Sequence, residues 1–350
     1  LMTKILLAHG SGGKLTHQLI NELFLKKFAN PVLSKLTDAA VVAGSERLAF
    51  TTDSYVVKPI FFPGGDIGKL AVCGTINDLA VMGAKPLYIS CGLIIEEGLD
   101  YAVLEKIVNS IAETAKKTNV KIVAGDTKVV EKGSADQLFV NTTGIGLLDK
   151  NTNLSPKNIQ VGDKILVNGA IGDHGLAVLS QRQGFEFQSN IKSDCSALHG
   201  LIQQILKVSR KVNPVRNISA RYAISHGVKF MRDPTRGGLA TVLNEIVYNS
   251  KFGILLDEEK IPIHEEVKAF SELLGFDPLY IGNEGKVVVI VADEDTNKVL
   301  KTMRRHPLGK ESTVIGEVIA EPIGKVCLKT LVKGTRLVDM LVGDQLPRIC

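Results

Sequence analysis

Hydrophobic and polar positions alternate in short β-branched stretches along the first 150 residues. This period of two predicts strands in "RLAFTTDSYVV", "PLYISCGLII", "VKIVAGDTKVV" and "LFVNTTGIGLL". Between them, "LDYAVLEKIVNSIAETAKKTN" places Leu104, Ile107, Val108 and Ile111 on one side of a helix. Strands that cluster beside helices without regular alternation are typical of the α+β class, and their exposed sheet faces would be covered in a sheet-to-sheet homodimer.

The pattern restarts after a polar stretch at residues 150–160. Helices are expected after "IGDHG" and "RGG", and strands at "FGILLD", "GKVVVIVA", "STVIGEVI" and "KVCLKTLV". The segment "LKVSRKVNPVRNISARYAIS" fits neither period, and we interpret it as a loop-bearing insertion without an assigned function. We therefore expect an N-terminal domain over residues 1–155, a C-terminal domain over 156–335 and a mobile tail over 336–350.

Composition narrows the class of protein. With 350 residues, 45% hydrophobic and 23% charged, the chain can bury a substantial core. Its net charge of +5 is spread along the chain without a basic block, which disfavours nucleic acid but is compatible with nucleotides as ligands. No apolar run approaches the length of a membrane span. Five cysteines without a CxxC pair predict a reduced, cytoplasmic protein.

Four aspartates lie beside apolar, strand-like segments: Asp38, Asp53, Asp78 and Asp126. A buried carboxylate needs a compensating cation, and Mg²⁺ prefers carboxylate and phosphate oxygens, so the set predicts metal ions on a triphosphate. The alternative for each single residue is a helix or turn cap.

A glycine-rich stretch, "HGSGGKLTHQLINELF", places Gly10, Ser11, Gly12 and Gly13 directly before a helical pattern. Backbone amides at such a helix start can bind phosphate, although the Walker A sequence is absent. The alternative is an ordinary solvated first turn.

Two turns of the second half carry charged residues. In "MRDPTRGGLATVLNEI", Asp233 lies with Arg232 and Arg236 at a helix start, where they can hold an anion or orient a substrate, or form a structural ion pair. In "YIGNEGKVVVIV", Glu284 is a candidate base, with a turn-forming role as the alternative.

The sequence ends "LPRIC", so Cys350 is its last residue. Position alone favours an incidental residue. A terminal thiol nevertheless has reach, because it can enter a cleft, receive a group from one protein and deliver it to another. Arg348 favours the thiolate and the terminal carboxylate opposes it, so the sequence leaves the direction of the thiol pKa open.

Taken in order, "HGSGGK", "FTTDSYVV", "TINDLAVMGAKP", "GDTKVV", "GDHG", "MRDPTRGGLA", "GNEG" and "PRIC" resemble the hydrogenase maturation proteins of the ATP-using aminoimidazole ribonucleotide synthetase superfamily. The resemblance covers essentially the whole chain. It implies a PurM-like subunit with an N-terminal sheet domain that forms a homodimer, a C-terminal α/β sandwich domain and a flexible tail. ATP and Mg²⁺ would lie between the domains.

The resemblance also implies an activity. Cys350 would accept a carbamoyl group from the carbamoyltransferase HypF, and ATP-dependent dehydration would convert it to a thiocyanate. The HypC–HypD complex would receive the cyanide for the iron of [NiFe] hydrogenase. By resemblance, the aspartates and Asp233 bind the nucleotide and metal, Lys128 is the cation near the phosphate, Glu284 is the base and Cys350 is the acceptor.

Three alternatives remain. A small-molecule kinase or a selenophosphate synthetase would share the aspartate motifs, but the latter resembles a pattern with Cys near the N-terminus, whereas "HGSGGK" has none. The third is a non-catalytic carrier that only presents a modified Cys350. Consumption of ATP by the purified protein would discriminate a carrier from an enzyme.

Overall fold

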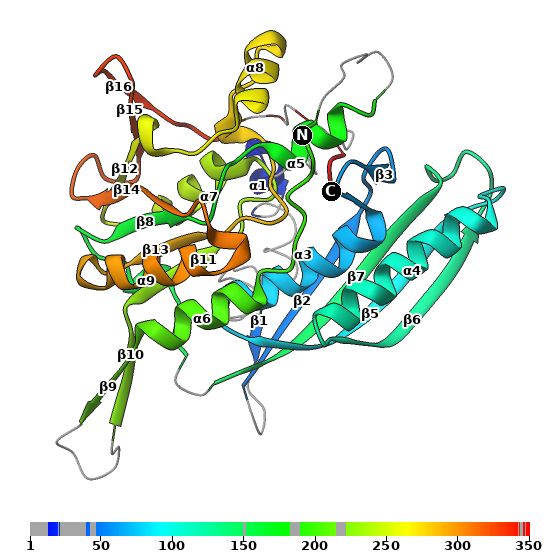
Figure 1. Cartoon of the computed structure of the whole chain (residues 1–350), viewed down its shortest axis with the longest axis horizontal. Helices are drawn as coiled ribbons and strands as arrows, with labels where there is room; N and C mark the ends of the chain where they lie inside the picture. The colour runs from blue at the N-terminus through cyan, green and yellow to red at the C-terminus, as the bar shows by residue number, and fades with distance from the viewer. Residues whose placement is uncertain are drawn as a thin grey trace.

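A computed structural model describes residues 13–19, 21, 40–42, 47–149, 152–182, 190–214, 222–341, 343, 346 and 348–350. Two large mixed sheets lie side by side, and each is backed by helices (Figure 1). The first draws its strands from residues 40–148 and the second from residues 164–337. The α+β class expected from the sequence is confirmed.

The five-stranded N-terminal sheet has the order β1-β2-β7-β5-β6. All its neighbours are antiparallel except β5 and β6, which run parallel and are connected through a helix. Its strands are β1 (Ala40–Val42), β2 (Arg47–Tyr55), β5 (Lys85–Glu96), β6 (Lys121–Val130) and β7 (Leu138–Leu148), and the small hairpin β3 (Phe61–Phe62) and β4 (Gly65–Asp66) follows β2. The four strands predicted in the first half are β2, β5, β6 and β7.

Among the described residues, the helices that pack on this sheet lie on one of its faces. They are α3 (Ile67–Val81) and α4 (Tyr101–Lys117). The Asp66 side chain begins α3 by accepting hydrogen bonds from two backbone amides of its first turn. We call the side under α3 and α4 the covered side. The opposite face carries the exposed side chains of Phe50, Tyr88 and Ile94, and we call it the open face.

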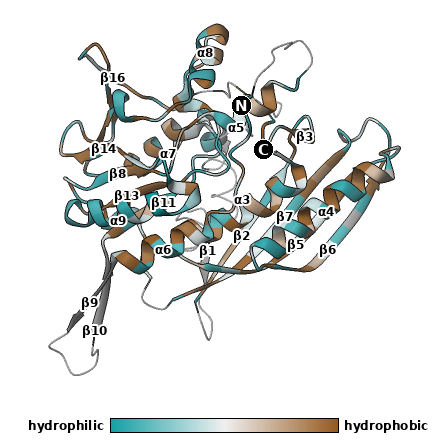
Figure 2. Ribbon diagram, viewed as in Figure 1, coloured by the Kyte–Doolittle hydropathy of each residue, from teal (hydrophilic) through white to brown (hydrophobic). Residues whose placement is uncertain are grey.

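The seven-stranded C-terminal sheet has the order β11-β13-β8-β14-β12-β15-β16. Its strands are β8 (Lys164–Val167), β11 (Val228–Arg232), β12 (Gly253–Asp257), β13 (Val288–Val291), β14 (Thr313–Ile319), β15 (Val326–Lys329) and β16 (Thr335–Leu337). β13 is brown along its length in Figure 2, whereas α9 (Asp293–Arg305), which packs over it, is mostly teal. The strands predicted in the second half are β12, β13, β14 and β15.

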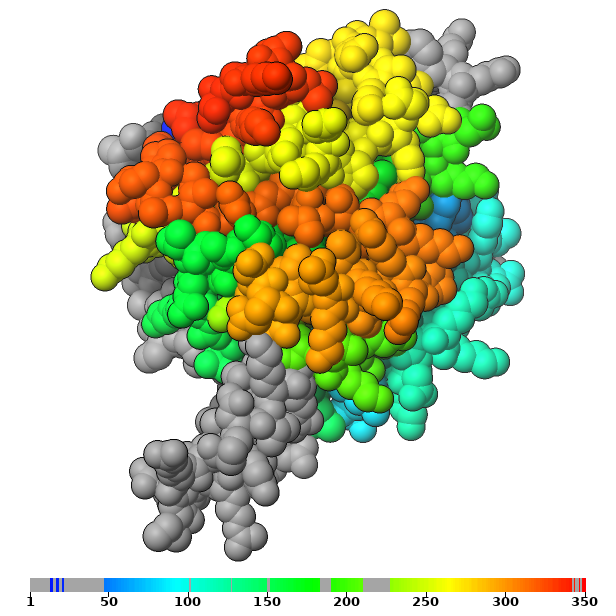
Figure 3. Space-filling model, turned by 60° about the vertical axis from the view of Figure 1, so that its left-hand side comes forward, coloured from blue at the N-terminus to red at the C-terminus, as the bar shows by residue number. Residues whose placement is uncertain are grey.

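Helices pack on both faces of the second sheet. α6 (His199–Ser209) and α9 contact Leu166 and Val289 on one face, and α7 (Gly238–Val247) contacts Ile165 and Ile290 on the other. The remaining elements are α1 (Lys14–Leu19), α5 (Asp173–Leu179), α8 (Glu265–Leu274), the 3₁₀ turns at Pro156–Asn158, Glu258–Lys260, Pro278–Tyr280 and Pro307–Gly309, and the hairpin β9 (Arg210–Pro214) with β10 (Tyr222–His226). The face shown in Figure 3 is formed mainly by this second unit.

A shared core joins the two units. Ile67 and Ile76 of α3 belong to the same buried cluster as Leu176 of α5 and Ile281, so the covered side of the first sheet faces the second unit. Within the described ranges, no helix combines the length and apolar composition that a membrane crossing needs.

Candidate functional site

The end of the chain is docked against the body. We call the described residues Leu346, Arg348, Ile349 and Cys350 the tail segment, and Figure 1 places its end beside β3. Val56 N donates a hydrogen bond of 3.2 Å to Cys350 O, and Lys58 N donates one of 3.1 Å to Arg348 O. The tail segment therefore pairs antiparallel with the chain that leaves β2.

Apolar side chains anchor the tail segment. Leu346 and Ile349 are only 3% and 5% exposed and join the core cluster that both units share. A Cβ at Gly282 would lie 2.6 Å from Ile349 Cδ1 and 2.5 Å from Thr235 O, so only glycine fits there. The first glycine of the "GNEG" motif thus makes room for the tail.

His174 contacts the tail from α5. Its Nε2 donates to Ile349 O at 2.7 Å, and its Nδ1 accepts from the Ser193 hydroxyl at 2.8 Å. Burial lowers the pKa of His174, which keeps the imidazole neutral and fits one donor and one acceptor nitrogen.

Glu284 sits in a turn that is fixed from several sides. Its amide donates to Asp194 Oδ1 at 3.0 Å, and Asn77 Nδ2 of α3 donates to its carbonyl at 3.2 Å. The adjoining Gly285 has no room for a Cβ, which would collide with Asp194 O. The sequence therefore holds the Glu284 backbone rigidly at the contact of the two units.

The Glu284 carboxyl group lies in a dry environment. It is 3% exposed, and its Oε1 has no hydrogen-bond partner within the part of the chain that the structure describes. Burial, together with the nearby charges of Asp53 and Asp233, raises its pKa well above the usual value. Such a carboxyl is protonated more readily than usual, and it is a strong base once ionised.

Arg236 connects the two units beside the thiol. Its Nη2 pairs with Asp53 Oδ1 at 3.1 Å, and its guanidinium lies within hydrogen-bonding reach of the Cys350 sulfur. The pKa of Arg236 is raised above its ordinary value by the groups that face it, the Cys350 sulfur and the Asp53 carboxylate, so it stays a cation. Arg236 is thus placed to face any group carried on the sulfur.

The docked thiol is held in its neutral form. Enclosure of the sulfur raises the pKa of Cys350 to about 12; Arg236 opposes this shift, and Glu284 and Asp53 add to it. The structure therefore answers a question that the sequence left open, because it favours the thiol over the thiolate in the docked position.

Two further predicted residues lie on the covered side. Asp78 of α3 accepts from the Thr51 hydroxyl at 2.7 Å. Asp233 accepts from the Thr235 hydroxyl at 3.2 Å, and burial raises its pKa. The charged turn predicted at Arg232, Asp233 and Arg236 is divided, since Arg232 pairs with Glu245 at 2.8 Å rather than facing Asp53.

Asp126 and Lys128 lie elsewhere. In the sheet register Asp126 is opposite Gly92, which is opposite Asn141, and this row faces the open side. The two side chains pair with each other at 3.4 Å and are each 69% exposed. A single chain therefore does not bring Lys128 together with Glu284 and Cys350.

The remaining predicted residues are Gly10, Ser11, Gly12 and Asp38, which lie outside the described residues. Gly13 directly precedes α1 and is buried. Among the described residues, no group of three or more His, Cys, Asp or Glu side chains forms a preformed metal centre. The metal-binding roles of Asp38, Asp53, Asp78 and Asp126 stay predictions.

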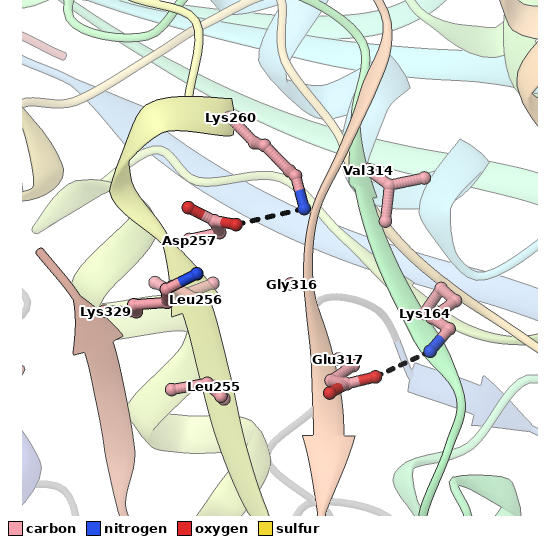
Figure 4. Close-up of a pocket in the computed structure, with 9 residues that line it drawn as sticks. All are labelled: Lys164, Leu255, Leu256, Asp257, Lys260, Val314, Gly316, Glu317 and Lys329. Carbon is pink, nitrogen blue, oxygen red and sulfur yellow. Dashed lines mark hydrogen bonds and ion pairs between the residues drawn. The ribbon is translucent and has the colours of Figure 1, made fainter. Parts of the chain in front are cut away.

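A separate groove of about 310 Å³ lies on the C-terminal sheet and contains none of the predicted site residues (Figure 4). Lys164 pairs across it with Glu317 at 2.6 Å, and Lys260 pairs with Asp257 at 3.0 Å. Its charges are thus largely neutralised internally, and it is unrelated to the tail segment.

Sequence patterns missed several contributing residues. Asn77, Ser193, Asp194 and Lys286 hold the Glu284 turn and His174, and Lys286 pairs with Asp194 at 3.0 Å. Asn77 lies within "TINDLAVMGAKP" and Lys286 directly follows "GNEG", but neither was assigned a role, and Ser193 and Asp194 lie in none of the quoted motifs. The "GDHG" motif did mark a turn at His174, although its contact with the tail was not foreseen.

Comparison with known proteins places this geometry in a family. The AIR synthase related protein models match over residues 36–148 for the N-terminal domain and 160–329 for the C-terminal domain. The chain is 47% identical over 345 residues to carbamoyl dehydratase HypE of Bradyrhizobium diazoefficiens, covering 98% of this chain and 95% of that protein. The chain belongs to the HypE family of AIR synthase related proteins.

Other HypE proteins extend the similarity. HypE of Escherichia coli K12 is 44% identical over the full length of both chains. The crystal structure of a HypE–HypF complex matches with a TM-score of 0.83 and 46% identity over 92% of this chain and 99% of that one. A HypE structure in complex with ATP matches with a TM-score of 0.78 and 44% identity over 99% and 100%. Thiamine monophosphate kinase of Aquifex aeolicus, at 17% identity and a TM-score of 0.63, shares the fold.

Proposed function

We infer that this chain is an ATP-dependent carbamoyl dehydratase that matures [NiFe] hydrogenase. It would accept a carbamoyl group on Cys350 and dehydrate it to a thiocyanate, the donor of the iron cyanide ligand. The observation that carries this inference is the docking of Cys350 against the core that both units share, where the Arg236 cation and the buried Glu284 carboxyl both act on its thiol.

The site suits dehydration of an amide. An amide oxygen leaves poorly, but transfer of a phosphoryl group from ATP to that oxygen makes it a good leaving group. As the C–O bond breaks, the nitrogen loses its two protons, and the products are an S-cyanate, ADP and phosphate. Glu284 is placed to take a proton from nitrogen, because its unpaired Oε1 faces a dry site and its ionised form is strongly basic.

Arg236 and the backbone contacts of the tail would position the carbamoyl group on Cys350. Arg236 faces the group on the sulfur and can stabilise negative charge that develops on the carbamoyl oxygen. The backbone pairing of Cys350 with Val56 fixes the reacting atoms, and the buried Ile349 excludes water from one side. The geometry thus supports an intramolecular reaction on the chain's own thioester.

Nucleotide and Mg²⁺ fit the carboxylates present. Asp53, whose side chain is 25% exposed, and Asp78 lie at the edge of the enclosed site and offer the hard oxygen atoms that Mg²⁺ prefers. Asp53, Asp78 and Asp38 would hold Mg²⁺ on the triphosphate, Asp126 on the open face would add a ligand only across the dimer interface proposed below, and Gly10 to Gly13 would contact phosphate through backbone amides.

A homodimer would complete the site. The open face exposes Phe50, Tyr88 and Ile94 and also carries Lys128 and Asp126. Stacking of two open faces would bury this apolar surface and bring Lys128 into an interface with the partner subunit. A nucleotide bound near that interface could then contact residues from both copies.

The partners follow from the same proposal. HypF would deliver the carbamoyl group, and the HypC–HypD complex would receive the cyanide, in the cytoplasm. The solved HypE–HypF complex supports the first partnership for a relative that is 46% identical.

The test uses the full chain with HypF, a carbamoyl donor and ATP. Intact mass should show a carbamoyl increment that falls by one water only when ATP and Mg²⁺ are added. A carrier would keep the carbamoyl increment unchanged, and a small-molecule kinase would consume ATP without any change in the mass of the chain.

A further inference from the structure

Arg348 holds the tail segment through its side chain. Its Nη1 donates to Asp136 Oδ2 at 2.7 Å, its Nε donates to Val56 O at 3.0 Å, and its guanidinium lies 6.0 Å from the centre of the Phe139 ring. The residue is two positions from the thiol, so these contacts help to fix where Cys350 lies. Among these three partners of Arg348, Asp136 is the one that carries a negative charge.

Asp136 is shared between the tail and the body. Lys58 Nζ pairs with the same Oδ2 at 2.8 Å, and the Lys58 amide donates to Arg348 O. Arg182 donates to Arg348 O at 2.8 Å and to Lys58 O at 2.9 Å. Lys58 and Arg348 both lower the pKa of Asp136, which keeps its carboxylate ionised at neutral pH.

The backbone of Arg348 has an unfavourable conformation in the docked tail, so the contacts of the tail must hold it there. Arg348 has a φ of 58°, in the left-handed region that a residue with a side chain adopts reluctantly. Release of the tail would relieve this strain, and the ion pair with Asp136 opposes release. The contacts of Arg348 therefore favour the docked tail, and the backbone strain favours its release.

The two half-reactions need different positions of Cys350. Dehydration requires the sulfur docked against the shared core near Glu284, whereas in that position Cys350 is only partly exposed and its raised pKa disfavours the reactive thiolate. A tail released into water regains an ordinary thiol, which reacts through its thiolate. The balance between the docked and released tail thus decides which reaction is favoured.

We propose that Asp136 is a positioning residue that clasps Arg348, and that this clasp sets the fraction of chains in which Cys350 is released to react with a partner. This deepens the proposed function and rests on it for the meaning of release, but release itself is measurable without any carbamoyl chemistry. The ion pairs of Asp136 are with Arg348 and Lys58, and Lys58 in turn donates its amide to Arg348, so Asp136 acts on Cys350 through the position of Arg348.

The experiment measures the rate at which iodoacetamide alkylates Cys350 in the full chain, located by peptide mass mapping. Asp136→Asn removes the negative charge and should increase the alkylation rate about fivefold. A change of this size is typical when a partly exposed hydrogen bond between charged groups is lost. Asp136→Arg, which places a third cation beside Lys58 and Arg348, should increase it further. Asp136→Glu should restore the rate to near that of the wild type.

Asp257→Asn is the matched control. It also removes a partly exposed aspartate from an ion pair, that with Lys260 at 3.0 Å, and it lies in the separate groove of the C-terminal sheet. Its alkylation rate should equal that of the wild type. Equal rates for Asp136→Asn and wild type would overturn the proposal, as would an equal increase in Asp257→Asn.

A second readout separates positioning from simple loss of structure. HypF-dependent carbamoylation should be at least as fast in Asp136→Asn as in the wild type, and dehydration of carbamoylated Asp136→Arg should be slower with an unchanged KM for ATP. A parallel loss of both reactions would contradict the clasp. If wild-type Cys350 is never carbamoylated, the proposed function fails while the alkylation result still decides whether the clasp exists.

Discussion

The two faces of the N-terminal sheet differ in how complete their chemistry is within one chain. On the covered side, β2 and α3 meet the second unit, and the Arg236–Asp53 ion pair lies near Glu284 and Cys350, whose pKa values burial raises. On the open face, Asp126 and Lys128 form only an exposed pair. Among the described residues of one chain, the candidate residues of the covered side contact one another, whereas those of the open face form a separate pair.

The two faces therefore differ in whether their charged side chains are buried or hydrated. Those on the covered side gain their properties from burial, which removes water and makes each charge influence its neighbours. Lys128 retains its hydration and pairs weakly with its neighbour. We therefore expect the covered side to act within one chain and the open face to act between chains.

The strongest way to break the covered side is to remove its thiol. Cys350→Ala should abolish the carbamoyl adduct completely while the protein still binds nucleotide, because no other side chain would carry the group. Intact mass and nucleotide titration would check both statements. Alanine at Cys73, Cys91, Cys195 or Cys327 is the control and should cost at most stability through lost packing, about 1–2 kcal/mol.

Mixed dimers test whether the two faces act across chains. Glu284→Gln and Lys128→Ala should each be inactive alone, but co-refolded mixtures should recover about a quarter of wild-type dehydration, since half of the dimers would contain one intact site of two. Glu284→Gln mixed with Cys350→Ala should recover nothing, because both residues belong to the covered side of one chain. Absence of recovery in the first mixture would place Lys128 and Glu284 in the same chain's site.

A pH profile should sharpen the role of burial at Glu284. Its pKa is raised, so the ionised base becomes populated only as pH rises, and dehydration of pre-carbamoylated protein should fall about tenfold per pH unit below that pKa. Single-turnover rates measured by intact mass would show this. A rate that is already constant at the usual pKa of a glutamate would contradict the assignment.

The sequence predicted elements better than contacts. Period-two alternation located β2, β5, β6 and β7, because their side chains lie alternately toward helices and toward the open face. It did not reveal α3, which is buried nearly all round and so lacks a polar face. A helix is recognised by the separation of polar and apolar positions onto two faces, and α3 shows almost no such separation.

For the candidate site, the sequence proposed individual residues but not their grouping in space. Asp53, Asp126 and Lys128 all lie on strands, yet one residue of register decides which face each side chain occupies. Arg236 was recognised as part of a charged turn, but its partner Asp53 is 183 residues away. Asp136 and Asp194 occur in segments without periodicity, so only the fold brings them to the tail and to Glu284.

The central claim is that the buried carboxyl of Glu284 dehydrates the group carried by Cys350 on the covered side. The most direct measurement follows the intact mass of pre-carbamoylated Glu284→Gln after ATP and Mg²⁺ are added, beside the wild type. The wild type should lose one water, and the variant should keep its carbamoyl group on Cys350 and dehydrate at least about 100-fold more slowly. Loss of water at the wild-type rate from the variant would contradict the account.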